Sequence, residues 1–134
     1  MNSDTVENYL LRMEIPNEQL DEATWVLAPE SLRDSRIIMK VSAPIVLFSA
    51  PLFTLNASST GREALFRRLL EFNEELLHCS YGLQGEQVVL SGAQQLENLD
   101  YNEFQAMIDD MSMSLDRHLG ELAPWRPVEP QEGA

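Results

Sequence analysis

Apolar residues recur every three or four positions in three stretches of the chain, and this spacing predicts three helices. They cover residues 4–14, 61–77 and about 100–121. The first is expected to end at Pro16, because the residue before a proline disfavours helical geometry. The apolar stripe of the middle helix is broader than a single packing seam needs. This helix is therefore expected to contact more than one neighbour.

All three helices carry capping signals at their starts. Asp4 with Glu7, Thr60 with Glu63, and Asp100 with Glu103 match the pattern in which two residues three apart cap each other's backbone N–H groups. Each helix is therefore expected to begin directly after its N-cap residue.

The segments between the helices are typical of strands. Before the middle helix, three short apolar runs cover residues 23–28, 36–42 and 45–55. The third run contains Pro51, which predicts a bulge or an edge strand because proline cannot donate to a sheet. After the middle helix, residues 79–92 predict a hairpin with glycine in its tight turn.

The predicted order of elements is α-β-β-β-α-β-β-α. Strands joined by short turns cannot be parallel neighbours. The fold class is therefore α+β, with a mostly antiparallel sheet packed with helices in a single domain over residues 1–122. Residues 123–134 are rich in proline and are expected to form a disordered tail, in which only Trp125 docks.

The second and third predicted strands are apolar at nearly every position. A sheet with one solvated face should instead alternate between apolar and polar residues. Both faces are therefore expected to be covered, either by the protein's own helices or by a partner chain. The sequence favours neither cover over the other.

Charge excludes two classes of partner. The 134 residues include 22 acidic and 9 basic side chains, for a net charge of −13. Phosphate backbones and anionic lipids would repel such a chain, so we expect no nucleic-acid partner and no membrane partner. The start of the chain does not resemble a secretory signal, and a single cysteine fits a reducing compartment. The expected location is cytoplasmic.

Residues suited to catalysis are few. His78 and Cys79 are adjacent, so on a strand they would point to opposite faces and not form a pair. His118 lies near the end of the third predicted helix, where the helix dipole favours a cation. Glu74 and His78 alone do not make a metal site. The sequence predicts no catalytic residue, no metal, no cofactor and no enzyme, with a cryptic site at these histidines as the alternative.

The only basic cluster is Arg62 with Arg67 and Arg68. It is either a small anion site or a set of charges paired within the helix to neighbouring glutamates. The second interpretation is favoured, because residues three and four apart on a helix lie side by side.

The order of elements, the size and the acidity resemble the bacterial type III secretion chaperones of the Tir-chaperone (CesT) class. The local likeness runs from 65 to 119 and includes the segments LFRRLLEFNEELLHCSYGLQGEQVVLSG and LENLDYNEFQAMIDDMSMSLDRHL. The first segment matches a recurring leucine-rich helix that ends in asparagine, at Leu69, Leu70, Phe72 and Asn73. The related YbjN family resembles the same pattern.

This resemblance implies a small, acidic, cytoplasmic homodimer without catalytic activity. Such a protein holds an extended segment of a partner, such as a secreted effector, on apolar sheet and helix surface. The residues implied for the partner surface are Leu10, Met13, Trp25, Leu27, Ile38, Val46 and Phe48. Those implied for the dimer interface are Leu65, Leu69, Phe72 and Leu76. The alternative implied by the YbjN likeness is a regulatory protein that binds a folded partner.

Overall fold

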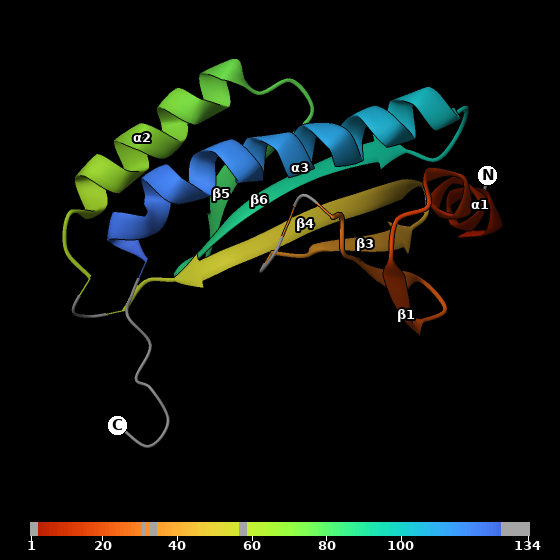
Figure 1. The fold of residues 1–134 in the computed structure, drawn as a ribbon, viewed down its shortest axis with the longest axis horizontal. Coiled ribbons are helices and arrows are strands. Elements are labelled where there is room, and N and C mark those ends of the chain that lie inside the picture. Colours follow the sequence, from red (N-terminus) through yellow and green to blue (C-terminus); the bar gives the residue numbers. More distant parts are fainter. Residues whose placement is uncertain (1–2, 31, 33–34, 57–58, 127–134) are drawn as a thin grey trace.

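Three helices pack on one face of an antiparallel sheet (Figure 1). The structure is a computed structural model that describes residues 3–30, 32, 35–56 and 59–126. Within these residues the helices are α1 (Ser3–Met13), α2 (Arg62–Glu75) and α3 (Tyr101–Leu122), with a 3₁₀ turn η1 (Ala123–Trp125) after the last. The strands are β1 (Asn17–Asp21), β2 (Thr24–Leu27), β3 (Ile37–Ser42), β4 (Ile45–Thr54), β5 (Ser80–Gln84) and β6 (Gln87–Gln95).

The sheet has six strands in the order β1-β2-β3-β4-β6-β5. This arrangement confirms the predicted α+β class with an antiparallel sheet. The structure adds β1, a strand that the polar sequence NEQLD does not predict. The segment becomes a strand because it forms a hairpin with β2, whose turn is closed where the Ala23 N–H donates to Asp21 Oδ1 at 2.8 Å.

The three predicted capping boxes have different outcomes. At α1 the predicted N-cap is wrong, because the helix begins at Ser3 and Asp4 lies inside it. At α3 the box is present, because Asp100 Oδ1 accepts from the Glu103 N–H at 2.7 Å and Glu103 Oε1 accepts from the Asp100 N–H at 3.3 Å. At α2 the prediction is wrong. The N-cap there is Gly61, which has φ 71° and makes no side-chain cap. A positive φ suits glycine, and it turns the chain into the helix without help from Thr60.

Pro51 marks a bulge and not an edge. The register of β4 against β6 shifts between Pro51 and Phe53, and β4 lies inside the sheet between β3 and β6. The last pair of β3 with β4 is Ile38 with Ser49. Pro51 therefore lies beyond the end of β3, where its missing N–H costs no ladder bond.

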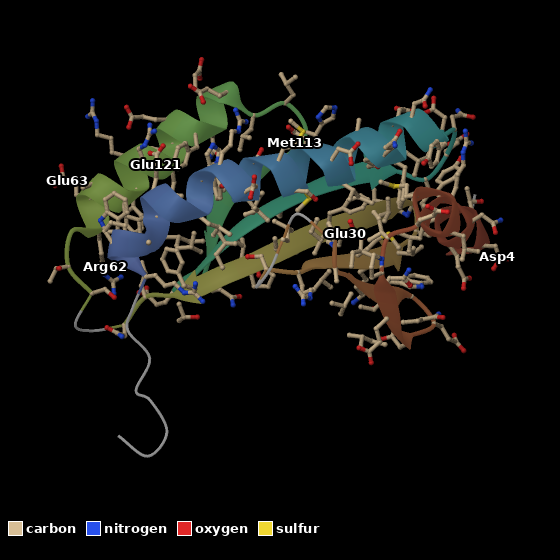
Figure 2. The ribbon with its side chains drawn as sticks, viewed as in Figure 1. Asp4, Glu30, Arg62, Glu63, Met113 and Glu121 are labelled. Atoms are coloured by element: carbon tan, nitrogen blue, oxygen red, sulfur yellow. The ribbon has the colours of Figure 1, made fainter. Side chains whose placement is uncertain are left out.

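The core lies between the sheet and the helices. Along the strands, the face toward the helices buries Trp25, Met39 and Phe48, each at most 1% exposed. The opposite face carries half-buried Ile38 and exposed Leu47. The protein's own helices therefore cover one face of the sheet, and the second face stays partly open. Acidic side chains project from the outer surfaces of α2 and α3 (Figure 2).

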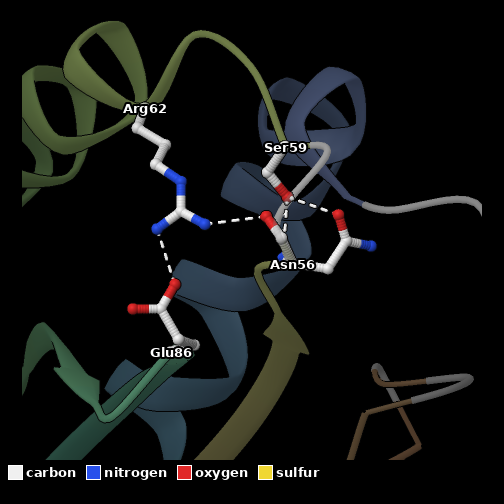
Figure 3. Close-up of polar contacts among 4 residues, drawn as sticks. All are labelled: Asn56, Ser59, Arg62 and Glu86. Atoms are coloured by element: carbon white, nitrogen blue, oxygen red, sulfur yellow. Dashed lines mark hydrogen bonds and ion pairs between the residues drawn. The ribbon is translucent and has the colours of Figure 1, made fainter.

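The basic cluster pairs mainly with other elements. Arg62 donates to Glu86 in the β5–β6 turn and, at 2.8 Å, to the Asn56 carbonyl (Figure 3). Arg68 donates to Glu121 of α3 at 2.7 Å, and its contact with Glu71 in its own helix is longer, at 3.7 Å. These ion pairs therefore join α2 to the β5–β6 turn and to α3, whereas the sequence favoured pairing within the helix.

The described start of the predicted tail packs on the domain. Residues 123–125 form the turn η1, in which Pro124 occupies an early position that needs no N–H. Trp125 is half-buried against the core. Residues 127–134 lie outside the described residues, and the domain boundary at 122 stays a prediction.

Candidate functional site

The two edges of the sheet differ in how their backbone groups are satisfied. At the β5 edge, Asn73 of α2 reaches the outward-facing backbone of Tyr81. Its Oδ1 accepts from the Tyr81 N–H at 2.7 Å, and its Nδ2 donates to the Tyr81 carbonyl at 3.1 Å. One side chain thus takes the place of a neighbouring strand. This edge is blocked against further strand pairing at Tyr81.

Replacing Asn73 with alanine is expected to lower the free energy of unfolding by about 1–3 kcal/mol, because two half-buried backbone groups lose their partner. Urea denaturation followed by circular dichroism measures this change. Glu74→Ala, which removes an exposed side chain from the same helix, is the matched control. Equal stability of the two variants would contradict the role assigned to Asn73.

The β1 edge is open. All five residues of β1 are exposed, and within the described part of the chain the strand pairs on one side only, with β2. The Ala28 N–H donates to the Pro16 carbonyl at 2.8 Å. The backbone groups of Pro16 and Glu18 therefore point toward β2. In an antiparallel ladder the backbone N–H and C=O groups of the intervening residues point away from the paired strand. The backbone groups of Asn17 and Gln19 therefore face outward from the sheet.

One exposed apolar side chain lies on this strand, and another lies on the helix that precedes it. Leu20 of β1 is 57% exposed and Leu11 of α1 is 69% exposed. The side-chain amides along β1 bond the backbone of their own segment: Asn17 donates to the Ile15 carbonyl at 2.9 Å and Gln19 to the Asp21 carbonyl at 3.0 Å. The edge thus combines backbone groups directed outward with nearby apolar surface.

Most of the side chains implied for the partner surface lie in the core of the single chain. Five are at most 1% exposed: Leu10, Trp25, Leu27, Val46 and Phe48. The other two, Met13 and Ile38, are half-buried. Their role in partner binding stays a prediction, and direct contact with a bound segment is open only to Met13 and Ile38 in this conformation. The hydrophobic pattern missed β1 and Leu20, because an open edge leaves no apolar periodicity in a polar strand.

The side chains implied for the dimer interface also face inward. Leu65, Leu69 and Phe72 are buried, and Leu76 is half-buried. The exposed apolar side chains of this region are Leu70 (68%), Leu77 (88%) and Met113 (63%). Figure 2 shows Met113 on α3 beside the segment that follows α2. The homodimer stays a prediction.

The histidine and cysteine at the start of β5 meet a single carboxylate. Asp110 Oδ2 lies 3.2 Å from His78 Nδ1 and 3.8 Å from Cys79 Sγ. Burial, with the nearby Asp110 charge, raises the pKa of Cys79 to about 12. The thiol is therefore protonated at neutral pH, whereas a nucleophile needs the thiolate. Among the described residues, no group of three or more His, Cys, Asp or Glu could hold a metal ion.

His118 is a buried member of an aromatic cluster and not a charge at a helix end. Its Nδ1 lies 2.7 Å from the Tyr81 hydroxyl, and its ring stacks on Phe72 with centroids 3.8 Å apart. Burial lowers the pKa of His118, with the Arg117 charge acting in the same direction. The cluster thus joins α2, β5 and α3 around a neutral imidazole.

The free energy of unfolding is expected to fall as the pH falls, because His118 takes up a proton when the chain unfolds. Because its pKa is lower in the folded chain, the unfolded state binds more protons once the pH falls through the ordinary value of 6.5. Thermal melts between about pH 7.5 and pH 5.5 should show a smaller loss of stability for His118→Gln than for the unmodified chain. Equal pH slopes for the variant and the unmodified chain would contradict this assignment.

Solved structures share this fold at low sequence identity. YbjN from E. coli matches with a TM-score of 0.66 and 16% identity, over 90% of this chain and 93% of that chain. A chain of the heterodimeric ExoU–SpcU complex, from the type III secretion system of Pseudomonas aeruginosa, matches with a TM-score of 0.67 and 15% identity, over 89% and 98%. A chain of the HopA1–SchA chaperone–effector complex matches with a TM-score of 0.59 and 12% identity, over 92% and 91%.

Sequence comparison supplies the family. No curated protein sequence matches the chain. Among the described helices, none combines the length and apolar character needed to cross a membrane. The sequence profile of the CesT_Tir_1 family matches residues 1–126, which is nearly the whole chain. The resemblance to the Tir-chaperone class is thereby confirmed, and the chain belongs to the CesT_Tir_1 family.

Proposed function

We propose that this protein is a non-enzymatic, type III secretion chaperone-like protein that holds an extended segment of a partner along β1. The observation that carries the proposal is the open edge of β1, where the backbone of Asn17 and Gln19 faces outward. Family membership supports it, and so do the chaperone–effector complexes among the structural neighbours.

The binding energy would come from two sources. A partner strand added to β1 forms main-chain hydrogen bonds, which do not depend on the partner's sequence. Apolar side chains of the partner then gain affinity by covering Leu20, which is exposed on β1 in the free chain. Such a mode suits a chaperone, because it selects an extended segment and leaves the partner's folded parts free.

The remaining parts of the proposal concern the setting. The protein acts in the cytoplasm as a homodimer, and its partner is a secreted effector. The net charge of −13 keeps the chain soluble while apolar surface is exposed for binding. The alternative is a regulatory protein that binds a folded partner, and the likeness to YbjN supports it only at the level of the fold.

The test is a tagged pull-down of the full chain from its native bacterium. Mass spectrometry identifies the proteins that co-purify, and limited proteolysis maps the part of the partner that is protected. We expect one stoichiometric partner, held through a single segment that proteases cleave readily once it is released. Capture of several folded regulators, or of nothing but the protein itself, would contradict the proposal.

A further inference from the structure

A cavity opens where α1 ends and β1 begins. It has a volume of about 360 Å³ and lies between this junction, the loop that follows β2 and one side of α3. Met13, Ile15 and Ile108 give it apolar walls. Because Asn17 is the first residue of β1, a strand added to this edge would pass directly beside the cavity.

Among the described residues, the charged side chains that line the cavity are all acidic. They are Glu14, Glu30 and Asp109. Figure 2 shows Glu30 on the loop below α3. The cation of α1, Arg12, lies over the Tyr101 ring, 3.9 Å from its centroid, and does not line the cavity. Three carboxylates around apolar walls favour a cationic occupant with an apolar stem.

A buried hydroxyl in the cavity wall has no hydrogen-bond partner. Ser112 is 6% exposed, and its buried Oγ makes no hydrogen bond with any described residue. Buried polar atoms nearly always have partners in folded proteins. Since Ser112 lines the same cavity, rotation of its side chain toward an entering polar group would allow the missing bond to form.

The backbone at Glu14 supports a role for its side chain. Glu14 has φ 57°, the left-handed conformation that commonly follows the last turn of a helix. Glycine or asparagine adopts this conformation at less cost than glutamate. The helix end therefore gives no reason for a glutamate here, whereas the adjoining cavity does.

The spacing of the carboxylates distinguishes between kinds of cation. Among the described residues, no three acidic, histidine or cysteine side chains are grouped closely enough to hold a metal ion. A guanidinium group instead presents five N–H donors over a planar fork and can bond separated acceptors. Its three-carbon stem would lie along the walls formed by Met13 and Ile108.

We propose that this cavity receives an arginine side chain of the partner segment that binds along β1. The inference rests on the proposed function, because it names the chemistry of the segment. The protein thus selects extended segments in which an arginine is flanked by residues able to form a strand.

Two peptides test this inference on the full chain. They are acetyl-Thr-Val-Arg-Val-Thr-amide and the same peptide with citrulline, a neutral analogue of arginine of nearly the same shape. Titration followed by ¹⁵N NMR is expected to show about ten-fold tighter binding of the arginine peptide. The shifts should include the backbone amides of Ile15, Asp109 and Ser112.

Variants assign the preference to the cavity. Glu14→Gly should lower the ratio of the two affinities to near one, while the chain melts no lower because glycine relieves the positive φ. Asp109→Asn should lower the ratio in the same way. Glu74→Gln changes the net charge equally on an exposed part of α2 and should keep the preference.

The outcomes separate this inference from the proposed function. Equal affinities for the two peptides, with shifts along β1, would overturn the arginine pocket and leave edge binding in place. Arginine-dependent shifts at the cavity without shifts in β1 would support the pocket and count against binding along the edge. A preference that survives in Glu14→Gly and Asp109→Asn would overturn the pocket, and so would the absence of binding by either peptide.

Discussion

Phe48→Asp is expected to leave no stable folded protein, whereas Leu47→Asp at the neighbouring position leaves the fold intact. Phe48 is 1% exposed, and its ring packs against Phe104 with centroids 5.8 Å apart. Truncating a buried phenylalanine already costs about 3–5 kcal/mol. A buried carboxylate adds several kcal/mol of desolvation, so the total approaches the roughly 5–15 kcal/mol that stabilises a typical domain.

Leu47 is the matched control because it lies on the other face of the same strand. It is 39% exposed and pairs in register with Lys40 of β3. An aspartate at position 47 would face solvent beside this lysine, so the free energy of unfolding should change by no more than about 1 kcal/mol. Circular dichroism and urea denaturation compare the two variants. An equal loss of free energy of unfolding in both variants would contradict the assignment of the two sheet faces.

Gln19→Pro is expected to weaken partner binding by about a hundred-fold, which corresponds to roughly 2.8 kcal/mol. Proline removes the outward N–H of Gln19 and places a ring where an added strand would approach. The pairing of β1 with β2 should persist, because Glu18 and Pro16 supply the bonds that face β2. An edge strand tolerates proline at such a position.

Gln19→Ala separates the backbone from the side chain. Both variants lose the bond from the Gln19 amide to the Asp21 carbonyl, but alanine keeps the outward N–H. Isothermal titration with the captured partner should therefore give near-normal affinity for Gln19→Ala and a large loss for Gln19→Pro. Similar affinities for the two variants would rule out strand addition at this position.

Periodicity and turn chemistry predict most of the fold. The three helices, the hairpin around Gly85 and the α+β class follow from apolar spacing and from a glycine at φ 61°. The strand β1 does not follow, because all five of its residues are exposed and no apolar alternation marks it. The start of α2 is also missed, since Gly61 turns the chain there through its backbone and uses no side-chain cap.

The functional surface is harder to predict than the fold. Apolar strands do not reveal which residues face the helices, and a shift of one residue exchanges the two faces. The sequence therefore does not distinguish Trp25 and Phe48, which face the helices, from Ile38, which lies on the open face. The role of Asn73 depends on the backbone of Tyr81, eight residues later, and no local pattern encodes that contact.

The central claim is that an extended partner segment lies along β1. A photo-crosslinking amino acid placed at Leu20, which is 57% exposed on this strand, tests it inside the native bacterium. Leu77, which is 88% exposed and lies between α2 and β5, is the control position. The account predicts crosslinks from position 20 to one short segment of one protein, and no such crosslinks from position 77. Crosslinks from position 20 that scatter over a folded domain, or their absence while the partner remains bound, would contradict it.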